Sequence, residues 1–252
     1  MNAGSQRLLA VMLFGCLAAC ANHSGFKRAS PQVTAATNMQ LAIEYLRLGK
    51  LATSRDFVEL ALSEDPGSAD VQMTAGLVYE RINEMPKAER AYATGYRLGK
   101  TDPNILNTYA GFLCRTGKAV DGEKLFAEVA SSPLYQTPEV ALMNAGVCAR
   151  GTGDLVDAER YFNRALALHP NLPEAQLQLG NIAFDRGDAG QARDIVQRYL
   201  AVNAPTPEVL WLAFRAARKL GDNTAAAGFA RRVQTEFPNS QQAQMMRSGV
   251  DR

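Results

Sequence analysis

Six small residues recur along this chain at a nearly constant interval, and this period limits the possible fold more than any other feature. The intervals between them are 34, 34, 36, 34 and 34 residues. A fixed period of this size is typical of a stacked helical array in which each repeat is one helix pair. The six marker residues are Gly49, Asn83, Gly117, Gly153, Gly187 and Gly221.

The residues around each marker repeat as well. An Ala, Ser or Gly follows five residues after the marker, and in most repeats a large apolar residue follows four residues later, as Ala158 and Phe162 follow Gly153. Small residues let two helices approach closely, while large ones fill the space between helix pairs. Proline ends a helix and presets the next turn, so it is expected between units. Such prolines are Pro66, Pro103, Pro170, Pro205 and Pro238.

This unit resembles the tetratricopeptide repeat, a helix-turn-helix whose copies stack into a superhelix with a concave groove. The fourth copy is the cleanest and reads NAGVCARGTGDLVDAERYFNRALALHP over residues 144–170. The resemblance implies an all-α, right-handed superhelical solenoid of about six tetratricopeptide repeats over residues 36–240. The sixth copy departs most, with Phe214 where most copies have a small residue, as an end-capping unit can.

The amino terminus is typical of an exported lipoprotein. Arg7 precedes an apolar segment of residues 8–19, which is too short to span a bilayer permanently. The run Leu-Ala-Ala-Cys that ends at Cys20 looks like a lipobox, in which residues 1–19 are a signal peptide and Cys20 receives the lipid. Several acyl chains would make the attachment stable, because one chain binds only marginally. The alternative is a cysteine that follows an ordinary cleavage site by chance.

Two further segments complete the expected organisation. Residues 20–35 carry the acylated cysteine and are rich in Ser, Thr, Asn and Gly, which predicts a flexible tether. Residues 241–252 are predicted to be a polar tail, which either adds a short polar helix or frays. Cys16 follows bulky Phe14 and is a poorer lipidation site, so we expect it to be discarded with the signal peptide. Ala21 stands where similar lipoproteins of enteric bacteria carry an aspartate that retains them in the inner membrane, which favours the outer membrane, on its periplasmic face.

Composition and motifs favour a binding protein over an enzyme. A net charge of +2 is too small to indicate nucleic-acid binding. The only histidines are His23 and His169, and neither has a sequence partner that would make it a general base. Phosphate-binding and metal-binding motifs are missing as well, so we expect no catalytic residue, metal, cofactor or small-molecule substrate.

Two cysteines follow the signal region, Cys114 and Cys148, and they lie 34 residues apart. This spacing places them on the first helices of neighbouring repeats, at a distance that permits disulfide geometry. In the oxidising periplasm a bridge is favoured. The alternative is two buried free thiols that act as small apolar residues.

The concave wall of such an array is built mainly by the first helix of each repeat, and its residues predict where a partner binds. In the first two repeats the wall is apolar, which suits the apolar face of a partner helix or an extended segment; packing within the array explains the same residues equally well. The apolar candidates are Met39, Ile43, Leu46, Met73 and Leu77. Farther along, the wall is more polar: Asn107, Met143, Arg150, Gln178, Asn181, Trp211, Arg215 and Arg218. Asparagine amides there can hold a peptide backbone.

Basic residues also gather near the carboxyl end. They are Arg215, Arg218, Lys219, Arg231 and Arg232. A solvated helix face explains them more simply than a binding site does.

The third repeat carries the most distinctive run of the chain, Asn-Thr-Tyr-Ala-Gly-Phe-Leu-Cys over residues 107–114. With the lipobox and six repeats, this run resembles the PilF/PilW family of type IV pilus biogenesis and stability lipoproteins. The resemblance implies an outer-membrane pilotin that helps the type IV pilus secretin, a PilQ-like protein, reach the outer membrane and form its multimeric pore. The alternative is a lipoprotein scaffold for another envelope machine, such as β-barrel assembly or peptidoglycan synthesis.

Overall fold

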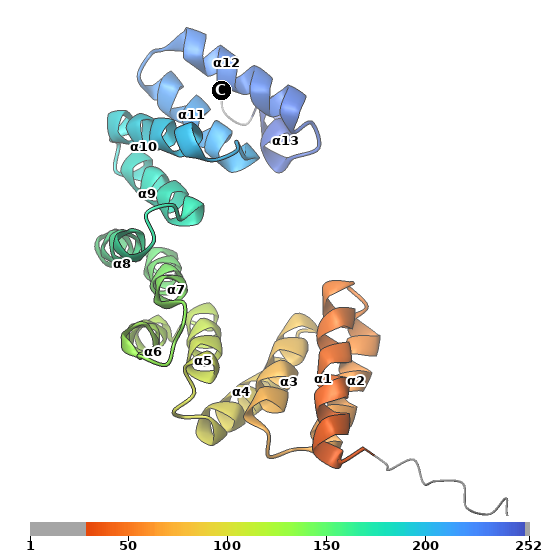
Figure 1. Ribbon diagram of the computed structural model, residues 1–252. Coiled ribbons are helices and arrows are strands. Elements are labelled where there is room, and N and C mark those ends of the chain that lie inside the picture. The colour runs from red at the N-terminus through yellow and green to blue at the C-terminus, as the bar shows by residue number, and fades with distance from the viewer. Residues whose placement is uncertain (1–28, 250–252) are drawn as a thin grey trace, which may run out of the picture.

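The computed structural model describes residues 29–249, and this part of the chain consists of α helices and turns without a strand (Figure 1). The helices pair along the chain into six repeats followed by one further helix. Their bounds are α1 Pro31–Arg47, α2 Leu51–Glu64, α3 Ala69–Arg81, α4 Met85–Leu98, α5 Pro103–Arg115, α6 Ala119–Ser131, α7 Pro138–Gly151, α8 Leu155–Leu168, α9 Pro173–Asp185, α10 Ala189–Val202, α11 Pro207–Lys219, α12 Asn223–Glu236 and α13 Gln241–Ser248. This architecture confirms the predicted all-α solenoid.

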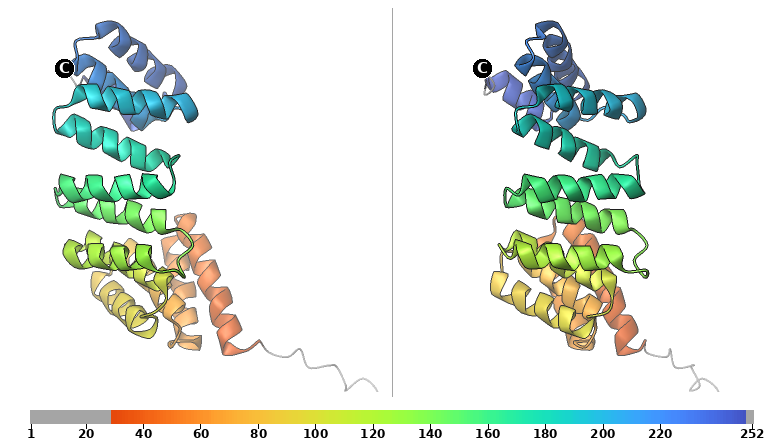
Figure 2. Two further views of the ribbon diagram at one scale, coloured as in Figure 1. Left: turned by 60° about the vertical axis from the view of Figure 1, so that its left-hand side comes forward. Right: turned by 90° about the vertical axis from the view of Figure 1, so that its left-hand side faces the viewer.

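The array curves as it stacks, which gives it an inner and an outer side. The two helices of each repeat pack against each other, and each second helix packs against the first helix of the next repeat. Figure 1 shows the resulting C shape, with α5 and α7 toward the inner side and α6 and α8 toward the outer side. The turned views in Figure 2 show the same successive layers from the side. The first helices therefore form a continuous concave wall.

The six marker residues owe their period to backbone geometry. All of them have positive φ, from 62° at Asn83 to 91° at Gly187. This left-handed conformation ends a helix, and glycine or asparagine adopts it most readily. In all six repeats the amide after the marker returns to the first helix, as when Lys118 N–H donates to the Leu113 carbonyl at 2.9 Å. Each marker thus turns the chain from the first helix of its repeat into the second.

Small residues stand where the two helices of a repeat cross. A Cβ atom added at Gly76 would lie 2.7 Å from the Tyr92 ring, and one added at Gly146 would lie 2.5 Å from the Phe162 ring. Both rings are fully buried. The aromatic side chain of the second helix therefore fills the space that the glycine of the first helix leaves open.

The predicted tether ends earlier than the sequence suggested. Helix α1 begins at Pro31, where the Ser30 hydroxyl accepts a hydrogen bond from the Val33 amide at 3.3 Å. Ala35 is buried and packs with Ala61 and Val71 of the next two helices. Residues 31–35 consequently belong to the solenoid, because serine followed by proline is a helix start rather than a linker.

The predicted polar tail forms a short helix over most of its described length. Helix α13 occupies residues 241–248, begins with the Ser240 hydroxyl as cap, and packs against α11 and α12. Ala243 is completely buried, and Met246 packs against the same core. These two apolar residues, three apart, give one turn of an otherwise polar helix a buried face. Helix α13 therefore covers the end of the array, as the last unit of a solenoid must.

The predicted signal peptide (residues 1–19) and Cys20 lie outside the described residues. Within residues 29–249, no helix combines the length and the apolar character needed to cross a bilayer.

Candidate partner-binding groove

A hollow of about 730 Å³ opens on the concave wall between α3, α5 and α7, and we call it the central groove. Its lining includes Leu77, Asn107, Gly111, Asn144, Val147 and the two cysteines 114 and 148. The groove is thus partly apolar, with two amides and a disulfide in its wall. The residues that line it offer hydrogen bonds and apolar contact, without a histidine that would serve as a general base.

Repeat register explains why these side chains share one surface. Leu77, Gly111 and Val147 each lie six residues before the marker of their own repeat. Leu77 and Val147 are among the exposed large apolar residues. Gly111 stands between them in the middle repeat and has no side chain, so the wall is recessed there.

A disulfide joins Cys114 of α5 to Cys148 of α7 in the wall of the central groove. The Cα atoms are 5.5 Å apart, within the normal range for a bridge. A Cβ atom added at Gly122 of α6 would lie only 2.5 Å from the Cys114 sulfur. The sulfur of Cys114 thus occupies the space beside Gly122, and the bridge ties the first helices of the third and fourth repeats together.

The two asparagines of the groove bind each other. The Asn144 amide group donates to the Asn107 side-chain oxygen at 3.3 Å, from α7 to α5. Both side chains are half-buried, and the Asn107 NH₂ group donates no hydrogen bond within residues 29–249. An amide with open donors beside an apolar wall is suited to a peptide backbone.

Ion pairs link consecutive repeats along the inner side. Arg115 of α5 donates to both Glu80 oxygens, at 2.6 and 2.9 Å, and the Tyr92 hydroxyl donates to Glu80 at 2.9 Å. Burial of the Glu80 carboxyl favours its neutral form, but these hydrogen bonds outweigh it and lower the pKa of Glu80 below its ordinary value. Arg150 of α7 similarly reaches Asp185 of α9 at 3.1 Å. These pairs position neighbouring first helices relative to one another.

The predicted apolar wall of the first two repeats is only partly accessible. Leu77 has 37% of its surface exposed and lines the central groove. Ile43 is half-buried at the same repeat position in α1. Met39 and Leu46 are half-buried and pack against the core. Met73 is 4% exposed and belongs to the core itself, so its assignment to the wall is wrong.

The burial of Met73 has a local cause. Gly95 of α4 faces it, and a Cβ atom there would lie 3.0 Å from the Met73 methyl carbon. The missing side chain leaves space into which Met73 turns. Met143 of the predicted polar wall is buried in the core as well.

Asn144, Gly111 and Val147 also line the groove, although the sequence did not predict them there. Gly111 and Val147 share a repeat position with Leu77, six residues before the marker, and this position is the sequence signal that could have identified them. Asn107, by contrast, was predicted and lines the groove together with Leu77.

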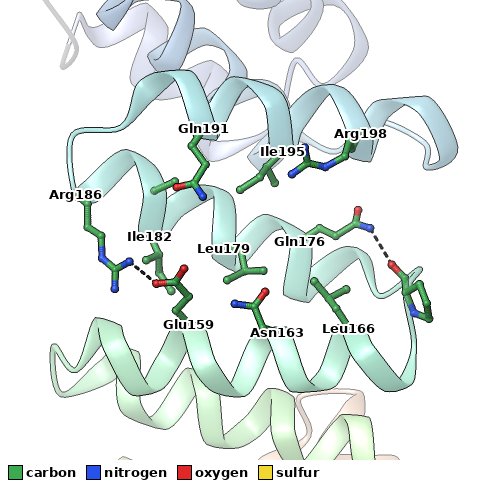
Figure 3. A pocket seen from close by; sticks show the side chains of 12 residues that line it. Glu159, Asn163, Leu166, Gln176, Leu179, Ile182, Arg186, Gln191, Ile195 and Arg198 are labelled. Atoms are coloured by element: carbon green, nitrogen blue, oxygen red, sulfur yellow. Dashed lines mark hydrogen bonds and ion pairs between the residues drawn. The ribbon is translucent and has the colours of Figure 1, made fainter.

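A second hollow, of about 360 Å³, lies among α8, α9 and α10 on the other side of the array (Figure 3). Leu179 and Ile182 of α9 line it, and Arg186 pairs with Glu159 of α8 at one end. At the other end the Gln176 amide donates to the Pro170 carbonyl at 3.1 Å. Both polar contacts connect the fourth repeat to α9, so we assign this region to the junction between the fourth and fifth repeats.

The described part of the chain contains no group of three or more His, Cys, Asp or Glu arranged to hold a metal ion. The inner wall therefore offers a binding surface made of amides, apolar side chains and paired charges.

Comparison with known proteins agrees with the tetratricopeptide repeat fold and shows similarity to proteins of type IV pilus assembly. Tetratricopeptide repeat family models match residues 118–173 and 149–217. The chain is 23% identical over 202 residues to the type IV pilus assembly protein PilF of Pseudomonas aeruginosa, covering 80% of each protein.

Two solved structures support the same relationship. The crystal structure of PilW, described as a widely conserved type IV pilus biogenesis factor, has a TM-score of 0.74 and 27% identity, covering 84% of this chain and 97% of PilW. The structure of Pseudomonas aeruginosa PilF has a TM-score of 0.69 and 21% identity, covering 87% of this chain and 99% of that one. The chain is therefore a tetratricopeptide repeat protein homologous to the type IV pilus biogenesis proteins PilF and PilW.

Proposed function

We propose that this protein is an outer-membrane lipoprotein that binds the type IV pilus secretin and promotes its localisation and multimerisation. The likeness to PilW over almost all of that chain carries the proposal most strongly. The lipobox that ends at Cys20 and the open central groove support it. In this role the protein is a scaffold, and no chemical step is required of it.

The central groove supplies the contacts for the secretin segment. Leu77 and Val147 offer apolar surface, and the Asn107 amide between them offers donors to a backbone carbonyl. An extended or helical segment with apolar side chains at regular spacing satisfies both kinds of contact. Residues 21–30 lie between the anchor and α1, and at about 3.5 Å per residue they would let α1 begin up to about 35 Å from the membrane.

We expect Cys20→Ser to abolish lipid attachment and outer-membrane localisation, because serine lacks the thiol that receives the lipid. The measurement is membrane fractionation together with mass spectrometry of the mature amino terminus. Cys16→Ser is the matched control, since Cys16 belongs to the predicted signal peptide, and it should change neither. An unmodified amino terminus in the wild type would contradict the prediction that Cys20 carries a lipid anchor.

We expect Leu77→Glu to weaken secretin binding by about 2 to 4 kcal/mol, because it places a charge in the apolar part of the central groove. Ile43→Asp tests the neighbouring repeat in the same way. The measurements are calorimetric binding to the purified secretin and the amount of secretin multimer in outer-membrane fractions.

The matched control for Leu77→Glu is Val156→Glu on α8, where an exposed valine outside the central groove receives the same charge. Both variants should keep the thermal melt of the wild type. A folded Leu77→Glu protein that supports normal multimers would exclude the groove as the secretin site. Co-purification of β-barrel assembly or peptidoglycan synthesis proteins in place of the secretin would favour the alternative scaffold.

A further inference from the structure

The carboxyl-terminal end of the concave wall carries a cluster of aromatic and basic side chains, which we call the basic aromatic patch. Phe184 of α9 and Phe214, Arg215, Arg218 and Lys219 of α11 line one hollow of about 330 Å³. Trp211 stacks beside Phe214, with ring centroids 5.5 Å apart. Arg231 and Arg232, which the sequence groups with these cations, lie on α12, and Arg232 pairs there with Glu236.

Repeat register places the patch on the same wall as the central groove. Arg215 lies six residues before its marker Gly221, as Leu77 and Val147 lie six residues before theirs. Phe184 and Arg218 likewise occupy the position of Cys114, three residues before the marker. The patch thus continues the concave wall by two repeats, but with cations where the central groove has apolar side chains.

Ion pairs join the first helices of the second and third repeats and those of the fourth and fifth repeats, but within residues 29–249 none joins those of the fifth and sixth. Glu80 pairs with Arg115, and Arg150 pairs with Asp185; in each case the partners lie three and two residues before successive markers. At the last junction the same two positions hold Phe184 and Lys219. Lys219 has no ion pair within residues 29–249, and neither has Arg215.

The carboxylates of the same region are engaged elsewhere. Asp185 binds Arg150, and Glu208 accepts from Gln242 of α13. Asp222 caps α12 by accepting from the Ala225 amide at 2.8 Å. Arg215 and Lys219 therefore present positive charge that no carboxylate within residues 29–249 pairs with.

Aromatic stacking preorganises one of these cations. The guanidinium carbon of Arg215 lies 4.1 Å from the centre of the Phe184 ring. Stacking leaves the edge of a guanidinium available, and that edge donates two parallel hydrogen bonds to a carboxylate. Less side-chain entropy is lost on binding because the ring already restricts the arginine.

We propose that the basic aromatic patch binds an acidic segment of a protein partner. Its Asp or Glu carboxylates pair with Arg215 and Lys219, while its apolar side chains contact Trp211 and Phe214. A protein segment fits better than a membrane because the patch lies on α9 and α11, two of the first helices that form the concave wall. A nucleic acid fits less well, since it requires a longer series of phosphate contacts than this chain of net charge +2 offers. This site is separate from the secretin site proposed for the central groove.

The test uses the full chain and a terminally blocked, fluorescently labelled peptide in which Glu alternates with Leu. A peptide with Gln in place of Glu is the neutral control. We expect the Glu peptide to bind, by fluorescence anisotropy, at least tenfold more tightly than the Gln peptide, and its affinity to fall with rising salt. Coupling with a carbodiimide should link its carboxylates to the Lys219 amine, in preference to Lys124 on α6.

The variant Arg215→Glu/Lys219→Glu should lower the affinity for the Glu peptide at least tenfold. Arg164→Glu/Arg231→Glu is the matched control, because it changes the net charge equally at exposed positions on α8 and α12, and it should leave the affinity unchanged. Equal binding of the two peptides, or equal effects of the two double variants, would overturn the proposal. Binding to phosphatidylglycerol vesicles or single-stranded DNA that depends on Arg215 and Lys219, without binding of the Glu peptide, would overturn it too.

Discussion

Replacing Phe162 with alanine should lower the free energy of unfolding by about 3 to 5 kcal/mol. The side chain is completely buried between α7 and α8 in the cleanest repeat. A Cβ atom added at Gly146 would lie only 2.5 Å from this ring, so the ring fills the space beside that glycine. Since glycine has no side chain to move in, removal of the ring would leave a cavity. Urea denaturation followed by circular dichroism measures the loss.

The control for Phe162→Ala is Val156→Ala in the same helix. Val156 is 71% exposed, so its truncation should change stability by less than about 0.5 kcal/mol. Equal effects of the two substitutions would show that the register assigned to α8 is wrong. An intermediate loss of stability with Phe162→Leu would support cavity formation as the cause.

Removing the bridge between Cys114 and Cys148 should lower stability by about 3 to 4 kcal/mol in the chain-entropy model, because it frees a long loop in the unfolded state. The two cysteines are 34 residues apart and join successive first helices. Denaturation of the wild type with and without reductant, beside Cys114→Ala/Cys148→Ala, measures the effect. The double variant should be insensitive to reductant.

Alkylation supplies the independent check on the bridge. Protein prepared from an oxidising compartment should show no thiol that reacts at Cys114 or Cys148 before reduction, and two after it. Two reactive thiols in the unreduced, denatured protein would contradict the bridge. In that case reductant should leave the denaturation curve of the wild type unchanged.

The repeat fold was predictable because its signals are local. A marker such as Gly117 must adopt positive φ to end one helix, and glycine is the residue that does so at least cost. The crossing of two helices within a repeat requires a small residue at Gly146 opposite a ring at Phe162. Both requirements recur in each unit, so they are visible as a period in one sequence.

The ends of the array were predicted less well. Ser30 and Pro31 sit in a polar stretch, and only the burial of Ala35 against Val71 shows that this stretch belongs to the first repeat. Similarly, Ala243 is one small apolar residue among polar ones until α11 and α12 cover it. Terminal elements depend on contacts with the body of the array, and composition does not record those contacts.

Sequence by itself determined the number of repeats and the turns between helices, and it placed Cys114 and Cys148 one repeat apart without deciding whether they are bridged. Tertiary structure alone decided which first-helix residues face solvent. Met73 and Asn107 occupy the same repeat position, yet Met73 turns into the space beside Gly95 whereas Asn107 lines the central groove. The physical reason is that exposure depends on the volume left by the neighbouring helices, and a repeat position specifies only the direction in which a side chain leaves its own helix.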